Sequence, residues 1–274
     1  NNLGTIRFVG TTTQNYYKTS TANTADLQNV VLNNTSTTPP QLIIKEGIGY
    51  QDLSVGTSGS FTFTSGVVST EGVRKIVIKN TASSAVSGHS QTSYVFGRLK
   101  RSVASATSYD FPVGGPPVAG NAYPYQLMNI YFSAMGSVSD LTASFENPTN
   151  ANGTGLPVTE PSASAGQWAT LLDNGGANTG TGYSGDLGGV WTIFPNSYAT
   201  APTYSMTLYG RNYDNQGNYQ HSILKRNTFC PGIWTASGSY NTSSVAGNVV
   251  TAARTSMSGF SQVAIAKTPV PLPV

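Results

Sequence analysis

The stretches Leu42-Ile43-Ile44-Lys45 and Ile76-Val77-Ile78-Lys79 decide the fold of this chain. Both are short apolar runs closed by a lysine, and glycine or asparagine marks the corners around them. The region that holds them lacks the strong two-residue turn signals that join antiparallel hairpins. Stacked coils of a parallel β-solenoid therefore explain the recurrence better than a meander does. In such coils we expect Asn33, Asn34 and Asn80 at corners, which need side-chain hydrogen bonds or left-handed backbone.

The rest of the chain is also patterned as strands. Apolar residues alternate with polar ones and helical periodicity is almost absent, so we predict an all-β fold. The strands expected in the first part are Thr5 to Val9, Asn29 to Leu32, Gln41 to Lys45, Ser60 to Thr64, Arg74 to Lys79 and Ser93 to Leu99. From about Tyr109 the runs lengthen, which is typical of an antiparallel β-sandwich. The strands expected there are Tyr125 to Ser133, Leu141 to Glu146, Val190 to Phe194, Thr203 to Tyr209, Ser222 to Arg226, Asn248 to Arg254 and Phe260 to Ala266.

These patterns divide the chain into three parts. Residues 1–107 are expected to form the β-solenoid-like region and residues 108–267 the β-sandwich. Residues 147–189, rich in glycine and small polar residues, are expected to form a long loop region with a short strand around Gln167 to Leu172. Residues 268–274 are proline-rich and predict a linker, because proline cannot donate to a central ladder.

The composition favours a stable β-rich protein of the cell exterior. Only 9% of the 274 residues are charged and 38% are hydrophobic, so Ser, Thr, Asn, Gln and Gly must supply the polar surface. The net charge of +3 comes from scattered cations and is no argument for a nucleic-acid partner. No run reaches the roughly 18 apolar residues of a membrane helix, which argues against membrane insertion. The single Cys230 cannot form an internal disulfide, so packing and ladder hydrogen bonds must stabilise the fold.

Several segments follow one another in a familiar order. The run Phe61-Thr62-Phe63-Thr64-Ser65-Gly66-Val67-Val68-Ser69-Thr70, then Lys75-Ile76-Val77-Ile78, is similar to a solenoid coil of the modular surface proteins that Bacteroidota export by type IX secretion. Tyr109-Asp110-Phe111-Pro112-Val113-Gly114 resembles their passage into a following sandwich, and Val190-Trp191-Thr192-Ile193 a later strand of it. The resemblance covers the chain from about Gly59 onward. It lies in the order of the segments and not in sequence identity. It implies an exported surface protein without a catalytic motif in this region, so it transfers no functional residue.

Acidic residues and histidines give little sign of catalysis or of a zinc site. No two acids form a close pair in the sequence, although distant strands could bring together the two carboxylates that glycoside hydrolysis needs. His89, His221 and Cys230 are isolated, so the spacing of zinc ligands is missing. We interpret both histidines as surface or structural residues, and Cys230 as a small buried one.

Calcium is the metal for which the sequence offers ligands. Asp173, Asn174 and Asp186 lie on one glycine-rich stretch, and Asp214 lies on another turn. Their oxygens suit calcium, whereas the same Asp-Asn-Gly clusters are also common turn formers. Both interpretations stay open, and no other cofactor is predicted.

Sugar binding is the second open question. Aromatic side chains in or beside loops either stack on sugar rings or cover the ends of the sandwich. The candidates are Tyr123, Tyr125, Trp168, Tyr183, Tyr213 and Tyr219.

A short basic segment invites two interpretations. On a strand, Arg98 and Lys100 would share one face and Arg101 would take the other. We expect a solvated edge strand, guarded by charge against strand addition, in preference to a polyanion-binding patch.

The leading hypothesis is therefore a non-enzymatic structural or adhesive module, extracellular or on the cell surface. No capping helix is visible at the start of the solenoid, so copies of the chain could stack into a filament or layer, or another surface protein could add a strand. The alternative is a carbohydrate-binding module of a secreted glycan-degrading protein, with polysaccharide as the partner.

Overall fold

The computed structural model describes residues 4–19, 26–117, 125–146, 170–171, 189–196, 199–211, 220–226 and 234–268, and the prediction of an all-β fold is confirmed there. One 3₁₀ turn, η1 (Ser83–Ala85), is the only helical element in these ranges. None of the described residues forms a helix long and apolar enough to cross a bilayer.

Each expected strand is found with shifted ends, except that the one expected over Ser93 to Leu99 is divided between two short strands on different sheets. The solenoid part contains β1 (Thr5–Gly10), β2 (Gln14–Tyr16), β3 (Leu27–Asn34), β4 (Leu42–Ile44), β5 (Leu53–Ser65), β6 (Val68–Thr70), β7 (Ile76–Ile78), β8 (Val86–Ser87), β9 (Val95–Phe96) and β10 (Leu99–Ser102). The later part contains β11 (Ser108–Gly114), β12 (Tyr125–Ala134), β13 (Asp140–Glu146), β14 (Thr170–Leu171), β15 (Val190–Pro195), β16 (Thr203–Arg211), β17 (Gln220–Arg226), β18 (Trp234–Thr235), β19 (Ser239–Ala246), β20 (Val249–Met257) and β21 (Gln262–Thr268). Among the strands that the sequence did not predict, β2 and β8 are very short and β19 is mostly polar, whereas β11 is seven residues long and mostly buried.

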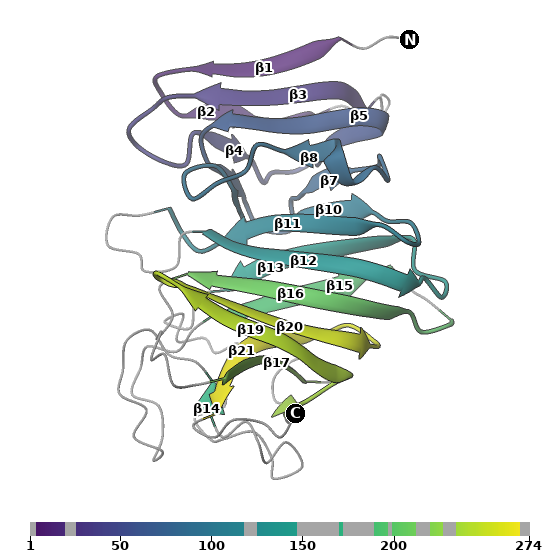
Figure 1. Cartoon of the computed structure of the whole chain (residues 1–274). Helices are drawn as coiled ribbons and strands as arrows, with labels where there is room; N and C mark the ends of the chain where they lie inside the picture. The colour runs from purple at the N-terminus through teal and green to yellow at the C-terminus, as the bar shows by residue number, and fades with distance from the viewer. Residues whose placement is uncertain are drawn as a thin grey trace.

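The N-terminal part is a solenoid of parallel coils, as predicted (Figure 1). Strand β5 spans a bend: residues 53–55 pair with β7, and residues 60–65 pair with β3. Residues 61–62 also pair with β8. Together with β6 and β9 on the second sheet, these strands give the two successive coils β5-β6 and β7-β8-β9 three short strand segments each. Leu53, Ile76 and Leu99 stand next to one another in three successive coils and are all buried.

Side-chain hydrogen bonds hold the corners of the coils. The buried Asn34 donates from Nδ2 to the carbonyl of Thr12 over 2.8 Å, and Asn80 donates to the carbonyl of Gly59 over 2.7 Å. These contacts confirm the predicted corner role of Asn34 and Asn80, whereas Asn33 lies within strand β3, paired with a neighbouring strand on each side. Gly88 sits at another corner with φ +75, and a Cβ there would lie 2.0 Å from the carbonyl oxygen of Phe63. Only glycine fits that position without a shift of the backbone.

The pairing changes from parallel to antiparallel near the predicted boundary at residue 107. On one sheet, β10 pairs parallel with β7 and antiparallel with β13. On the other, β11 pairs parallel with β9 and antiparallel with β12. Both sheets therefore run without a break from the solenoid into the antiparallel part, in the orders β1-β3-β5-β7-β10-β13-β15-β21-β17-β18 and β19-β20-β16-β12-β11-β9-β6-β4-β2.

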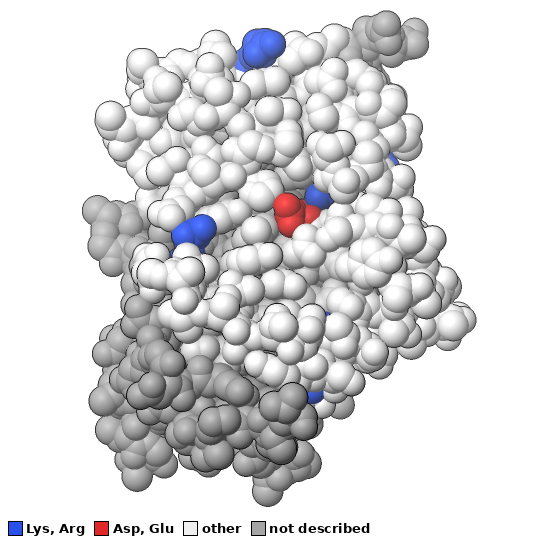
Figure 2. Space-filling model, in the orientation of Figure 1, with Lys and Arg blue, Asp and Glu red and all other residues white. Residues whose placement is uncertain are grey.

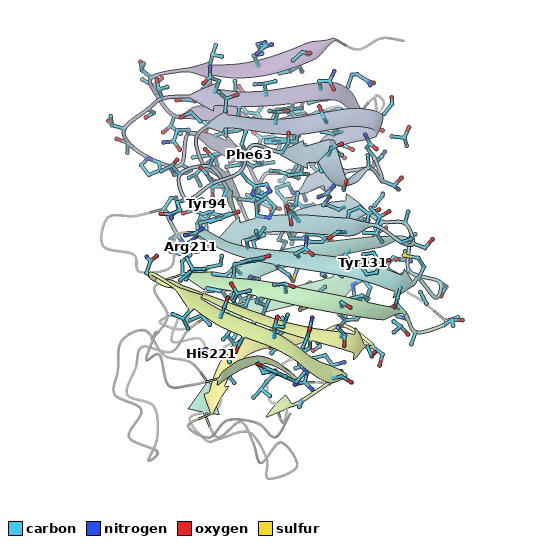
Figure 3. The ribbon with its side chains drawn as sticks, viewed as in Figure 1. Phe63, Tyr94, Tyr131, Arg211 and His221 are labelled. Atoms are coloured by element: carbon cyan, nitrogen blue, oxygen red, sulfur yellow. The ribbon has the colours of Figure 1, made fainter. Side chains whose placement is uncertain are left out.

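One apolar core fills the space between the two sheets. It extends from Val30 in β3 to Ile265 in β21 and includes the fully buried Trp191. Figure 3 shows how strand alternation divides side chains between core and surface: Phe63 of β5 is 3% exposed, whereas Tyr131 of β12 is 42% exposed. Because the sheets and the core are shared, the solenoid and the antiparallel part form one continuous body.

Candidate functional site

Most residues predicted for ligand binding lie outside the described ranges. These are the calcium candidates Asp173, Asn174, Asp186 and Asp214, the aromatic candidates Tyr123, Trp168, Tyr183, Tyr213 and Tyr219, and the single Cys230. Both hypotheses about them stay predictions.

Tyr125 is the exception, and the structure does not place it on an exposed loop. It is the first residue of β12 and is 4% exposed. Its hydroxyl lies 2.7 Å from Nδ1 of His89, and its ring packs beside Tyr94. The suggestion that Tyr125 stacks on a sugar is wrong, because the strand directs its ring into the protein.

His89 and Asp110 meet in a shallow hollow between β8 and β11. Nε2 of His89 lies 3.3 Å from Oδ2 of Asp110, and Asn129 donates to the other carboxylate oxygen over 2.7 Å. Burial raises the pKa of Asp110, but hydrogen bonds from His89 and Asn129 outweigh it and leave that pKa below its usual value. The hollow has a volume of about 390 Å³ and serines line much of the rest of it.

A histidine held by a carboxylate is a common arrangement for a general base. Here the second ring nitrogen of His89 is already engaged by the hydroxyl of Tyr125, and burial raises the pKa of that hydroxyl. The imidazole thus bridges the coil that contains β8 to strands β11 and β12. The geometry indicates a structural role for His89, which links the solenoid to the antiparallel part of the fold.

Arg101 lies behind this hollow, and its position corrects the predicted edge strand. Strand β10 is an interior strand, paired with β7 and β13. The expected alternation is present, since Lys100 is half-buried and Arg101 is 0% exposed. A strand pairs with β10 on each side, and a local charge pattern in the sequence cannot show which strands become neighbours.

The guanidinium of Arg101 fills a gap in the sheets. Strand β8 pairs only with β5, and no ladder joins it to β11. Arg101 donates to the carbonyls of Ala82 and Ser83 on one side and to that of Asp110 on the other, over 2.9, 3.0 and 2.9 Å. It also lies 5.0 Å from the ring centre of Tyr109. Burial lowers the pKa of Arg101 to about 10, so the group stays charged at neutral pH.

The described acidic residues do not gather into a metal site. No group of three or more His, Cys, Asp or Glu side chains occurs among them. Asp26 and Asp52 do line one groove, but each faces a lysine, at 2.9 Å from Lys79 and 3.1 Å from Lys75. The pKa of Asp26 is raised by burial and lowered more by Ser54 and Lys79, so this carboxylate is ionised and unsuited to act as a general acid.

The N-terminal end of the solenoid is the most unusual surface of the described structure. Strand β1 is the outer strand of its sheet and pairs only with β3. Ile6 stands next to Val30, and Phe8 next to Leu32, so both continue the inward-facing columns of the core. Val30 and Leu32 are fully buried, whereas Ile6 is 39% exposed. Among the described residues, the core column that ends at Ile6 is therefore only partly covered at this end, where Figure 1 shows β1 above the other coils.

Comparison with known protein families, curated proteins and solved structures finds no match for this chain.

Proposed function

We propose that this chain is a non-enzymatic structural module of the bacterial cell exterior that joins to further copies of itself through the open end of the solenoid. The observation that carries the proposal is the partly exposed Ile6, which continues the core column of Val30 on the outer strand β1. Export in the manner of type IX substrates would bring such a module to the cell surface.

A partly exposed column end favours association because apolar area and backbone groups are exposed together. Burying one large apolar side chain contributes about 1.5–3 kcal/mol. The free edge of β1 also offers N–H and C=O groups to an added strand, and its only charged residue is Arg7. Proteins that avoid such pairing usually protect the edge with prolines, several charges or bulges.

The opposite end of the body also presents an edge. Strand β19 is the last strand of the second sheet, is largely exposed and contains neither charge nor proline. One copy could therefore add its β19 end to the β1 end of the next. Because such a head-to-tail contact uses two different surfaces, it repeats and builds a filament.

The outer surface suits an extracellular structure. Figure 2 shows few charged side chains on the face seen in Figure 1, in keeping with the 9% charged residues of the chain. Small polar side chains on outward strand positions, such as Thr62 and Ser87, face each other across neighbouring coils. A rigid body with such a surface supports a structural role better than a catalytic one.

Electron microscopy and sedimentation velocity of the full chain test the proposal. We expect ordered filaments or sheets, or association that rises with concentration, for the wild-type protein. Ile6→Lys places a charge at the open column end and should abolish association. Ile48→Lys is the matched control, because Ile48 is fully exposed on the turn between β4 and β5 and lies outside the open end.

Two results would contradict the proposal. The first is a wild-type protein that stays monomeric across concentration, salt and pH. The second is association of Ile6→Lys equal to that of Ile48→Lys, which would move the contact elsewhere.

A further inference from the structure

A charged groove crosses the outer face of the solenoid, away from the open end. The first part of β5, together with β7 and β10, forms its floor. Ser54, Val77 and Lys100 stand side by side there in register, one on each strand. The groove has a volume of about 310 Å³. Because its floor consists of three hydrogen-bonded strands, the positions of its side chains are set by the coil spacing of about 4.8 Å.

Positive charge is concentrated in this groove. Five of the chain's 14 lysines and arginines line it, against two lining carboxylates, Asp26 and Asp52, and two flanking ones, Glu46 and Asp140, that pair with Arg74 and Lys100. The five cations are Lys18, Arg74, Lys75, Lys79 and Lys100. A protein with so few charged residues has no need of such a cluster for solubility alone.

Ion pairs hold the lysines in place without covering them. Lys75 lies 3.1 Å from Asp52, Lys79 lies 2.9 Å from Asp26, and Lys100 lies 3.1 Å from Asp140. The three lysine side chains remain 31%, 43% and 30% exposed. Their ammonium groups are therefore ordered in advance and still reach solvent, which lowers the entropic cost of binding an anion.

An exposed aromatic pair adjoins the groove. Tyr17 stacks on Tyr50 with ring centres 5.7 Å apart and planes 21° apart, and Tyr17 is 61% exposed. The pair is tied to the lining, because Arg74 donates to the carbonyl of Tyr50 over 2.6 Å. Lys18, which lines the groove, directly follows Tyr17 in the sequence.

We propose that this groove binds an acidic polysaccharide. Carboxylate or sulfate groups of the polymer would lie on the lysines, and a sugar ring would stack on Tyr17. Successive coils repeat at a spacing comparable to one sugar ring, so a linear chain can meet cations on several strands. Asp26 and Asp52 would accept hydrogen bonds from sugar hydroxyls, which the backbone of single-stranded DNA does not offer. The site is separate from the open end and does not depend on assembly.

Calorimetric titration of the full chain with polygalacturonate tests this proposal. Neutral dextran and single-stranded DNA of similar length serve as comparisons. We expect binding of polygalacturonate that weakens as salt rises, and weaker or no binding of the other two polymers. The double variant Lys79→Gln with Lys100→Gln should bind about tenfold more weakly, and Tyr17→Ala about threefold. Lys45→Gln is the control, since it removes one positive charge outside the groove, whereas the double variant removes two inside it.

Thermal unfolding of each variant shows whether it is folded. Binding by the folded double variant equal to that of Lys45→Gln would overturn the site, and equal binding of DNA or dextran would overturn the ligand class. If Tyr17→Ala binds like the wild type, the stacking contact is refuted.

Discussion

Replacement of Arg101 by alanine should destabilise the protein strongly, although a charge pattern in the sequence suggested a solvated strand there. The guanidinium makes three hydrogen bonds to backbone carbonyls and lies over the ring of Tyr109. Hydrogen bonds from a charged group contribute about 1.5–3 kcal/mol each, and part of this is offset by the cost of burying the charge. The truncation also leaves a cavity, and the three backbone carbonyls lose the hydrogen bonds that Arg101 donates to them. We expect a loss of about 3–5 kcal/mol in the free energy of unfolding.

Urea unfolding followed by the fluorescence of tryptophan measures this loss, because Trp191 is fully buried in the shared core. Arg101→Lys keeps the charge but cannot reach both sides of the gap, so an intermediate loss is expected. Lys100→Ala is the control, since this neighbour on the outer face makes a partly exposed ion pair with Asp140 and should cost less than about 1 kcal/mol. If Arg101→Ala and Lys100→Ala unfold at the same urea concentration, the guanidinium does not hold the gap between β8 and β11.

Three further predictions concern other parts of the fold. Gly88→Ala should cost about 2 kcal/mol or more by urea unfolding, because a Cβ would meet the carbonyl oxygen of Phe63 at 2.0 Å. Gly247→Ala has a similar positive φ with nothing within 4 Å, so equal losses in the two variants would refute the clash. The folded-state pKa of Asp110 is lowered, so its contribution to stability is present above the unfolded-state pKa of about 4 and is lost as pH falls through the folded pKa. Asp110→Asn should therefore flatten the fall of the unfolding free energy as pH drops below the unfolded-state pKa, and an unchanged slope would contradict the assignment. Trp191→Phe should cost about 1–3 kcal/mol in thermal unfolding, because it removes a hydrogen bond to a β12 carbonyl and part of a close-packed ring; a loss below about 0.5 kcal/mol would contradict this.

Local patterns in the sequence were enough to predict the strands and the class of fold. Alternation of apolar and polar residues depends only on neighbours along the chain, so Ile76 to Ile78 and Thr203 to Tyr209 could be identified as strands without knowledge of their partners. The corner roles of Asn34 and Asn80 followed in the same way, because the hydrogen bonds at a turn are determined by side-chain type.

Contacts across the coils could not be predicted from those patterns. The ion pair between Lys79 and Asp26 joins residues 53 positions apart, and other contacts between coils, such as Asn80 with Gly59 and Ser60 with Asn29, join residues 21 and 31 positions apart. Lys79, which closes the second apolar run, lines the groove, whereas Lys45, which closes the first, does not. The register of the coils therefore decides which charges meet.

The sequence by itself therefore determined that the chain is all-β, where its strands lie and that its first part is built from parallel coils, since these properties depend on short-range alternation and turn chemistry. Only the tertiary structure decided that β10 is an interior strand and that the buried Arg101 donates hydrogen bonds to carbonyls on both sides of the gap between β8 and β11. The same holds for Ile6, which is partly exposed at the end of a core column. These properties depend on which strands become neighbours, and strand order follows from the balance of packing and hydrogen bonding over the whole chain.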